Sequence, residues 1–338
     1  MRREELGTVY DLIYTNAEHV EQGALDGYAL AMTFGDVDND FDCTFGTQNA
    51  PNLADGCLLY AEDTEYGGIV RGKKTSTSEG TTTFTGSTWH GVMNEHVLSP
   101  PSGETHLKLR GDAHVALRTV IAACGLDQWF KVADGDSGIQ VSADIRYIKA
   151  YDAVAAMLAK SHAKLIIKWK RDRAELSAVD AVNHDSMNSD NANFTITEGY
   201  KPPNHMILLG KGEMLDRVVA EIFTDDEGNV SQTQHFFGLE EVTVTYEDTN
   251  AELAELIEKG TEKLIEAQDV NEIDVSSELV DDYDVGDYVT VTNLDAGQSA
   301  TAVVTSKTVN LIDGEPTFSC EIGSASALFD LNKEGGVT

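Results

Sequence analysis

The chain has 338 residues, of which 41% are hydrophobic, and this is enough apolar material to exclude a globally disordered polypeptide. Asp and Glu number 58 against 24 Lys and Arg, so the formal net charge is −34. Such a surface repels nucleic-acid backbones and anionic lipid, which argues against a nucleic-acid-binding function. The length corresponds to about two or three domains.

Targeting and redox signals are absent from the sequence. No apolar run reaches about 18 residues, so no membrane span is expected. The segment Met1 to Glu5 has basic residues without an apolar stretch behind them, so no signal peptide is expected. The four cysteines are far apart, which predicts neither a disulfide scaffold nor a zinc site. The acidity leaves three explanations open: solubility, a salt-adapted host, or a surface past which another polyanion slides.

Residues 1–98 predict an N-terminal β-barrel domain. Alternating or β-branched runs predict antiparallel strands at 9–14, 28–34, 41–45, 57–62, 66–71 and 81–86. Strands at this regular spacing favour a small barrel or sandwich. A short helical turn at 89–98 precedes Ser99-Pro100-Pro101, where we place the first domain boundary.

Residues 99–190 predict an α+β domain. Asp112 can cap a helix that Gly125 ends, with apolar positions at Val115, Leu117, Val120, Ile121 and Cys124. A second helix is expected from Tyr151, and strands are expected at 129–132, 139–147, 164–169 and 174–179. The Asp/Asn/Ser-rich stretch 184–193 is interpreted as a loop or a domain boundary.

Residues 191–338 predict a second β-rich, barrel-type domain that can be discontinuous with the first two. Its expected strands are 194–197, 206–210, 217–223, 242–246, 288–292, 300–309 and 317–322. The longest helix, 251–267, has Leu253, Leu256, Ile257 and Leu264 on one face, and we expect it to pack on a sheet. The predicted fold class is therefore mainly β with α+β parts.

Three patterns partly match functional motifs. Asp36-Val37-Asp38-Asn39-Asp40 has the alternating carboxylates of a calcium loop, but Phe41 and Thr47 occupy the positions that need Gly and Glu. Leu209–Glu213 has two glycines around a lysine but lacks the rest of a phosphate loop. His184-Asp185-Ser186 has the residue types of a catalytic triad, but adjacent residues cannot form one. We interpret them as a β-turn, a tight bend and a solvated loop.

No other pattern indicates an enzyme. The nine histidines are scattered, and no nucleophile-elbow or HExxH motif occurs. Trp89, Trp129 and Trp169 sit within apolar patterns and are predicted to be core anchors. We therefore predict no catalytic residue, no cofactor and no metal site, and the residues that bind partners stay unidentified.

Several ordered segments resemble the tail hub, or baseplate hub, proteins of tailed bacteriophages, in particular prophage tail proteins of long non-contractile tails. The segments are Leu12-Ile13-Tyr14, Asn39-Asp40-Phe41, Glu65–Val70, Thr85–Gly91, Arg110–Ala113, Ile145–Asp152, Asn204–Arg217 and Tyr283–Val291. The last two are the most telling, and together the segments span nearly the whole chain.

The resemblance implies tube-type β-barrel domains with smaller α+β domains, and a structural protein of the virion tail tip that assembles in the bacterial host cytoplasm. It implies a homotrimer that joins the six-fold tail tube or a distal tail protein to a three-fold central fibre or spike. DNA would pass the lumen without specific binding, along an acidic wall. The chain stops at Thr338, soon after its last strands, so a bare hub without an enzymatic extension is expected.

Two other functions remain open from the sequence. One is a receptor- or carbohydrate-binding protein at the tail tip, which needs an exposed aromatic cluster. The other is a wall-degrading enzyme on the same scaffold, which needs a concave site with a perturbed acid–base pair.

Overall fold

The computed structural model describes residues 9–188, 194–197, 201–226, 228–268, 272–275 and 283–324. The chain forms two compact units. The main unit comprises Met1–Phe194 together with Val275–Thr338, and the inserted unit comprises Thr195–Asp274. The boundaries of these two units differ from those of the expected segments 1–98, 99–190 and 191–338. The three segments remain a prediction about independently folding domains.

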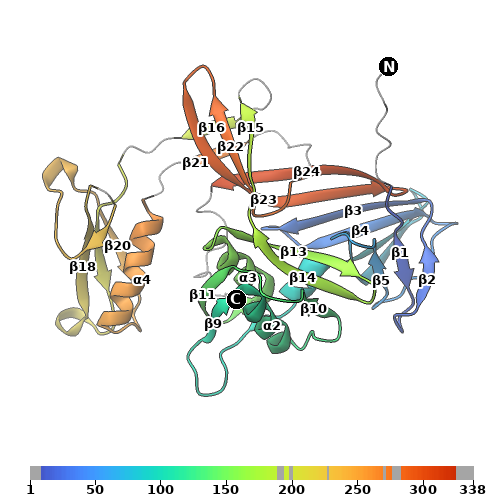
Figure 1. The fold of residues 1–338 in the computed structure, drawn as a ribbon, viewed down its shortest axis with the longest axis horizontal. Helices are drawn as coiled ribbons and strands as arrows, with labels where there is room; N and C mark the ends of the chain where they lie inside the picture. Colours follow the sequence, from blue (N-terminus) through green and yellow to red (C-terminus); the bar gives the residue numbers. More distant parts are fainter. Residues whose placement is uncertain are drawn as a thin grey trace. The chain divides into compact units, whose positions relative to one another are not determined.

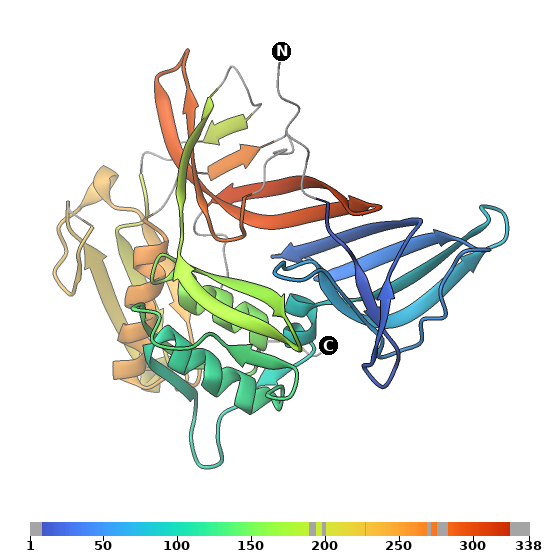
Figure 2. The ribbon, with the colours of Figure 1, turned by 45° about the vertical axis from the view of Figure 1, so that its right-hand side comes forward.

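The main unit is organised around one large sheet of eleven strands. Its strands are β1 (Ile13–Thr15), β2 (Glu21–Ala24), β3 (Tyr28–Gly35), β4 (Asp40–Gly46), β5 (Leu58–Tyr60), β6 (Gly67–Ser76), β7 (Thr81–Thr88), β15 (Asn183–Asn188), β22 (Tyr288–Asn293), β23 (Gln298–Ile312) and β24 (Glu315–Ser324). The order is β15-β22-β23-β3-β4-β7-β6-β5-β1-β2, with β24 paired to β23. The sheet curls so that β5, β1 and β2 turn back toward β3 and β4 (Figure 2).

The C-terminal strands complete the N-terminal sheet. Residues 306–312 of β23 pair with β3 on one side and with β24 on the other. The blue N-terminal strands therefore lie beside the red C-terminal ones (Figure 1). Chain segments that are distant in sequence thus form one sheet.

Alternation in the strand sequences decides which face of this sheet is buried. In β3, Leu30, Met32 and Phe34 are at most 2% exposed, whereas Ala29 and Ala31 are exposed. Successive side chains of a strand point to opposite faces, so one face collects the apolar residues. The enclosed core also contains large residues from β4, β7 and β23, namely Phe41, Phe45, Phe84, Val309 and Leu311. Each fully buried side chain of this size stabilises the fold by about 1.5–3 kcal/mol.

An α+β layer follows β7 within the main unit. Its elements are α1 (Trp89–Asn94), β8 (Val97–Leu98), β9 (Leu107–Asp112), α2 (Ala113–Cys124), β10 (Phe130–Val132), β11 (Gln140–Ile145), β12 (Ile148–Lys149), α3 (Ala150–Ala159), β13 (Ala163–Lys170) and β14 (Arg173–Asp180). The strands form the small sheets β10-β14-β13, β11-β9 and β12-β8. The expected α+β order is confirmed here.

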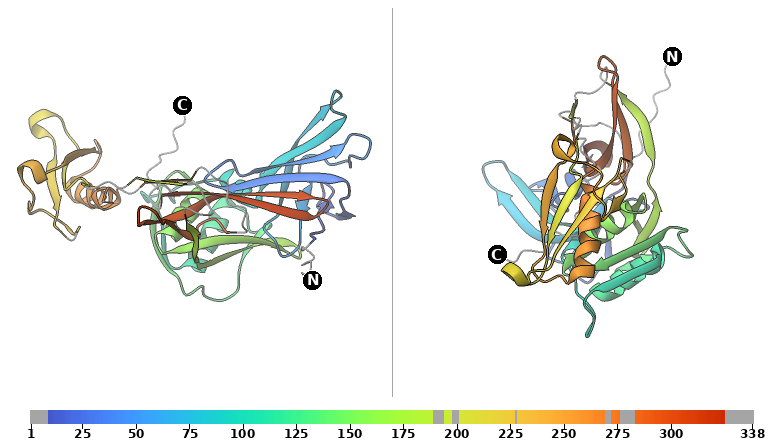
Figure 3. Two further views of the ribbon diagram at one scale, coloured as in Figure 1. Left: turned by 90° about the horizontal axis from the view of Figure 1, so that it is seen from above. Right: turned by 90° about the vertical axis from the view of Figure 1, so that its left-hand side faces the viewer.

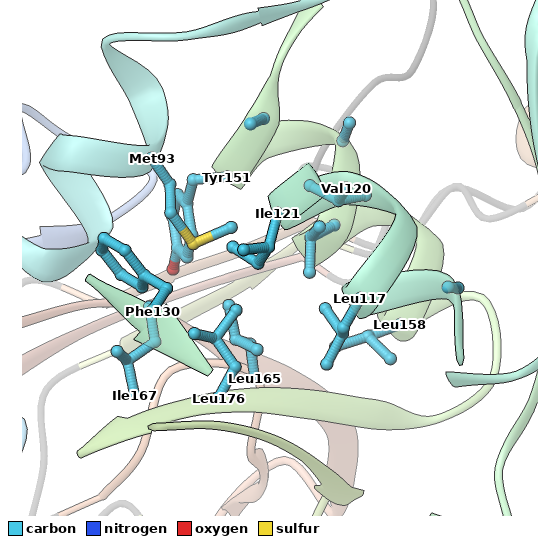
Figure 4. Packing of buried hydrophobic residues seen from close by; sticks show 14 of the residues in the cluster. Met93, Leu117, Val120, Ile121, Phe130, Tyr151, Leu158, Leu165, Ile167 and Leu176 are labelled. Carbon is cyan, nitrogen blue, oxygen red and sulfur yellow. The ribbon is translucent and has the colours of Figure 1, made fainter. Parts of the chain in front are cut away.

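The caps of α2 are the ones predicted. The Asp112 carboxylate accepts a hydrogen bond from the backbone N–H of His114 at 2.9 Å, and Gly125 adopts the left-handed conformation with φ 68°. Leu117, Val120 and Ile121 of α2 point into a core that also contains side chains from α3, β10, β13 and β14 (Figure 4). Val115 was expected on this face but is 48% exposed, because the buried stripe runs through Ala113, His114 and Ala116 instead.

Two of the three tryptophans anchor this core as predicted. Trp169 stacks on Tyr60 with ring centroids 4.6 Å apart and on Trp89 at 4.9 Å, which joins the small sheet to β5 of the large sheet. Trp129 is only half-buried and contacts the ring of His19.

The inserted unit is a small α/β sandwich. Its elements are β16 (Phe194–Thr197), β17 (His205–Leu209), η1 (Met214–Asp216), β18 (Val219–Thr224), β19 (Val230–Ser231), η2 (Gly238–Glu240), β20 (Thr243–Glu247), α4 (Leu253–Glu266) and β21 (Glu272–Val275). The four-stranded sheet has the order β19-β18-β17-β20, and α4 packs along one of its faces (Figure 3). Leu256 and Leu264 of α4 are fully buried on this sheet, as expected, whereas Leu253 is 50% exposed at the first turn of the helix.

Several elements differ from the sequence prediction, among them the unexpected strands β8, β9, β12, β19 and β21. Residues 183–188 form β15, which pairs in parallel with β22, although most of this stretch was interpreted as a loop. β2 was not expected, because Glu21–Ala24 has no apolar alternation. Among the described residues, strands far outnumber helices, which confirms the mainly β fold with α+β parts.

Candidate assembly surface

The large sheet ends in a long edge strand. Within the described residues, the ten-residue β24 has β23 as its strand partner, so it lies at an edge of the sheet. Pro316 lies near the start of this strand, and Glu315 and Glu321 are exposed on it. Charges and proline on an edge discourage indiscriminate pairing, whereas the free backbone can still receive a strand of a specific neighbour.

The outer face of the large sheet consists mainly of small side chains. Register places Thr33, Thr44, Thr83 and Thr308 on this face, and the hydroxyls of Thr44 and Thr83 are 2.9 Å apart. Short β-branched side chains form a flat surface that another protein can approach closely.

A buried ion cluster joins the large sheet to the α+β layer. The ammonium group of Lys164 on β13 lies 2.7 Å from Oδ2 of Asp284 and 2.7 Å from Oδ1 of Asp287. The Lys307 ammonium on β23 lies 3.6 Å from Asp284 Oδ1, and the Nε2 atom of His184 lies 3.1 Å from Asp287 Oδ2. The side chains of Lys164, Lys307 and Asp287 are at most 5% exposed. Buried charges of this kind persist only when they are paired.

Hydrogen bonds complete the cluster. Oδ1 of Asp287 accepts the backbone N–H of Val182 at 2.8 Å. Burial acts to raise the pKa of Asp284, but the hydrogen bond from Lys164 and the charges of Lys164 and Lys307 outweigh burial, so the pKa of Asp284 is lowered. The ammonium of Lys307 also lies 5.2 Å from the centre of the Phe318 ring on β24. The cluster therefore connects β13, β15, β23 and β24 through the turn that precedes β22.

Gly286 makes this turn possible. Its φ is +94°, and a Cβ atom at this position would lie 2.9 Å from Cβ of Lys164. Only glycine adopts this conformation without strain and leaves room for the lysine. Asp284, Gly286 and Asp287 belong to the segment Tyr283–Val291, so one of the two most telling segments of the resemblance builds this junction.

A second buried pair lies near the middle of β13. Oε1 of Glu65 accepts the backbone N–H of Ile167 at 2.9 Å and lies 3.6 Å from Nε2 of His90. Both side chains are less than 9% exposed, and the His90 ring stacks on Phe34 at 4.6 Å. Glu65 therefore attaches the loop between β5 and β6 to the small sheet.

The partial motifs have structural roles. Asp36–Asn39 forms the turn between β3 and β4, where the Asn39 side chain accepts the Gly35 N–H at 2.9 Å. The Gly210–Gly212 bend packs against α4, and Lys211 pairs with Glu252. His184 bonds to Asp287 and thereby takes part in the buried cluster. Among the described residues, no group of three His, Cys, Asp or Glu side chains is arranged to hold a metal ion.

The membrane prediction concerns helices only. In the described part of the chain, none of the helices has the length and hydropathy that crossing a bilayer requires.

Comparison with known proteins identifies the fold. No family model matches the sequence, and no curated protein matches it significantly. Among solved structures, the 43 kDa tail protein of prophage MuSo2 from Shewanella oneidensis matches with a TM-score of 0.54 and 11% identity, over 94% of this chain and 99% of its own. The prophage tail protein gp18 from Listeria monocytogenes EGD-e matches with a TM-score of 0.53 and 11% identity, over 92% and 94%. The tail protein from Neisseria meningitidis MC58 matches with a TM-score of 0.49 and 13% identity, over 95% and 98%.

The chain has the fold of phage tail proteins. The first two matches cover nearly the full length of both proteins in each pair. At this level of identity the similarity establishes the fold, and it confirms at that level the resemblance drawn from the sequence segments.

The buried lysines Lys164 and Lys307 are a structural feature that sequence reasoning missed. Lys164 stands at the start of the apolar run Leu165-Ile166-Ile167, and Lys307 occupies a buried position of β23 opposite Phe34 of β3. A lysine at a position that the strand pattern predicts to be buried needs a carboxylate partner. This requirement was the signal that the sequence offered. The identity of that partner could not be read from the local sequence.

Proposed function

We propose that the chain is a structural component of a phage tail: a hub that closes as a homotrimer and joins the tail tube, or a distal tail protein, to a central fibre or spike. The single observation that carries this proposal is the full-length similarity of fold to two prophage tail proteins. In this proposal the protein acts through its shape and its contacts, without enzymatic activity, at the tip of the virion tail after assembly in the host cytoplasm.

Two surfaces of the main unit support the assembly role. The edge strand β24 offers backbone groups to a neighbouring strand, and a closed ring of identical copies needs one surface that receives another. The flat outer face around Thr44 and Thr83 allows close packing of a second layer.

The proposal includes a DNA channel through the ring. With −34 charges per chain, three copies bring a total of about −100, which repels DNA over the roughly 8–10 Å screening length at physiological salt. An acidic wall would let DNA slide without adsorption. A ring whose inner wall is mainly Lys and Arg would contradict this part of the proposal.

The test has two readouts. Mass photometry and negative-stain images of the purified protein should show trimers and threefold rings. Particles purified from cells that carry the gene should contain the chain by mass spectrometry, with antibody labelling at one end of the tail. Absence of the chain from the particles would reject the proposal, and hydrolysis of peptidoglycan by the purified protein would favour an enzyme.

A further inference from the structure

A basic surface lies on the β13–β14 hairpin of this acidic chain. Residues 160–173 contain six of the 24 Lys and Arg of the chain and a single acidic residue, Asp172. Lys164 is buried in the ion cluster, whereas Lys168 and Arg171 are exposed. This short segment therefore carries a quarter of the Lys and Arg residues of the chain. Its local charge is positive, whereas the net charge of the whole chain is strongly negative.

Strand register gathers these cations on one face. In the sheet β10-β14-β13, Lys131 lies opposite Glu175, and Glu175 lies opposite Lys168. Lys170 lies opposite Arg173 at the hairpin turn. The reverse face carries the apolar side chains that pack against α2 and α3. We define the basic patch as Lys131, Lys168, Lys170, Arg171 and Arg173.

The patch is only partly neutralised within the described residues. Glu175 pairs with Lys170 at 2.5 Å and with Lys131 at 3.3 Å, and Asp172 lies 3.5 Å from Arg173. Lys168 and Arg171 are exposed cations that form no ion pair within 4 Å among the described side chains, although the charge of Lys168 helps to lower the pKa of Asp284 and the backbone N–H of Arg171 donates to Glu62 at 3.2 Å. Both side chains can therefore still approach an acidic surface.

A matching acidic surface exists on the inserted unit of the same chain. Thr195–Asp274 contains 19 Asp and Glu against 5 Lys and Arg, a net charge of −14. On α4, Glu255, Glu258 and Glu262 are exposed on the side away from the buried Leu256 and Leu264. We call these three residues the acidic face of α4.

The two surfaces have similar dimensions. Seven residues of helix separate Glu255 from Glu262, a rise of about 10 Å at 1.5 Å per residue. Two strand spacings separate Lys131 from Lys168, also about 10 Å. A helix that crosses the sheet can therefore place carboxylates over cations along its length.

We propose that the basic patch binds the acidic face of α4 from a second copy of this chain. The inference rests on the proposed function, because it names one of the contacts between copies in the assembly. Local charge complementarity favours a second copy, because its acidic helix presents exposed carboxylates at a spacing that matches the cations of the patch.

The test is a charge swap measured by sedimentation velocity across protein concentrations. At about 0.05 M NaCl the wild-type chain should self-associate, and at about 0.5 M the association should weaken because the screening length shortens. The variants K168E/R171E and E258K/E262K should each weaken association roughly tenfold or more. The variant that combines all four substitutions should regain most of the lost affinity, because the two surfaces have exchanged sign.

The control is K108E, which reverses an exposed lysine outside the patch and should leave association unchanged. Circular dichroism melts verify that each variant is folded. The inference would be overturned if either charge reversal left association unchanged, or if the wild-type chain stayed monomeric. A salt-dependent contact that does not depend on protein concentration would also overturn it. Duplex DNA binding at low salt that K168E/R171E abolishes, with self-association intact, would assign the patch to DNA and likewise overturn it.

The outcomes separate this inference from the proposed function. Threefold rings formed equally by wild type and K168E/R171E would retain the hub and reject the patch as its contact. Absence of the chain from tail particles would reject the hub, whatever the charge swap shows.

Discussion

The ammonium group of Lys164 lies 2.7 Å from Oδ2 of Asp284, although 120 residues separate the two along the chain. Lys164 belongs to the α+β layer, and Asp284 lies where the chain returns from the inserted unit to the large sheet. The lysine side chain is only 5% exposed. This pair therefore attaches the returning C-terminal strands to the remainder of the main unit.

Removal of the Lys164 charge should destabilise the protein strongly. Lys164→Met leaves Asp287 buried with one cation fewer, and breaking a buried pair in this way costs about 3–5 kcal/mol. Urea unfolding at neutral pH measures the change in unfolding free energy. The double variant that adds Asp287→Asn should lose less, because the most buried carboxylate then carries no charge while Asp284 keeps the ammonium of Lys307. A double variant less stable than Lys164→Met would contradict this account.

Gly286→Ala should destabilise the protein through both conformation and contact. The positive φ costs about 1–2 kcal/mol for a residue with a Cβ atom, and the close approach to Lys164 adds about 1–3 kcal/mol. Gly297→Ala is the matched control, since Gly297 also has a positive φ, +67°, with no atom within 4 Å of an added Cβ. Equal losses of unfolding free energy in the two variants would show that the contact with Lys164 is unimportant.

The cap of α2 should give a pH-dependent contribution to stability. Burial acts to raise the pKa of Asp112, but hydrogen bonds from Ser137, His114 and Gly138 outweigh it and lower this pKa to about 2. A carboxyl group whose pKa is lower in the folded state than in the unfolded state stabilises the native state at pH values above its ordinary pKa of 3.8. This stabilisation is lost as the pH falls through the pKa of the folded state.

The variant Asp112→Asn tests this. It should cost about 1 kcal/mol at neutral pH, because an amide cannot accept hydrogen bonds on both terminal atoms. The difference in unfolding free energy between wild type and Asp112→Asn should stay constant down to about pH 5. It should become smaller as the pH falls from about 4 toward 2. A gap that widens on acidification would reverse the sign of our argument.

The main unit should fold without the inserted unit. The inserted unit has its own core, which includes Met206, Leu208 and Leu256. β16 and β21 pair with each other where the chain crosses between the units, so a short Gly/Ser linker can replace Thr195–Asp274. The deletion variant should unfold cooperatively, with a melting temperature within a few degrees of the main-unit transition of the full chain. Loss of cooperative unfolding by calorimetry would instead make the two units a single folding domain.

Some strands and helices of this protein can be predicted from the sequence because the residues that specify them lie close together in the chain. The alternation of Leu30, Met32 and Phe34 predicts a half-buried strand, and the Asp112 and Gly125 pair predicts both ends of α2. β15 escaped prediction because its residues Asn183–Asn188 form a strand by pairing with β22, a partner more than a hundred residues away. Propensity is weak evidence where tertiary pairing supplies the hydrogen bonds.

The amino-acid sequence by itself determined all four α-helices that the structure describes and the strands with clear apolar alternation, the strong negative charge, and the segments that resemble tail proteins, since each depends on residues close together in the chain. The tertiary structure alone decided that β23 lies between β3 and β24, that Lys164 meets Asp284 and Asp287, and that Lys131, Lys168 and Arg173 share one face. The physical reason is that a buried charge or a strand edge requires a partner, and only the folded chain determines which distant residue comes within bonding distance.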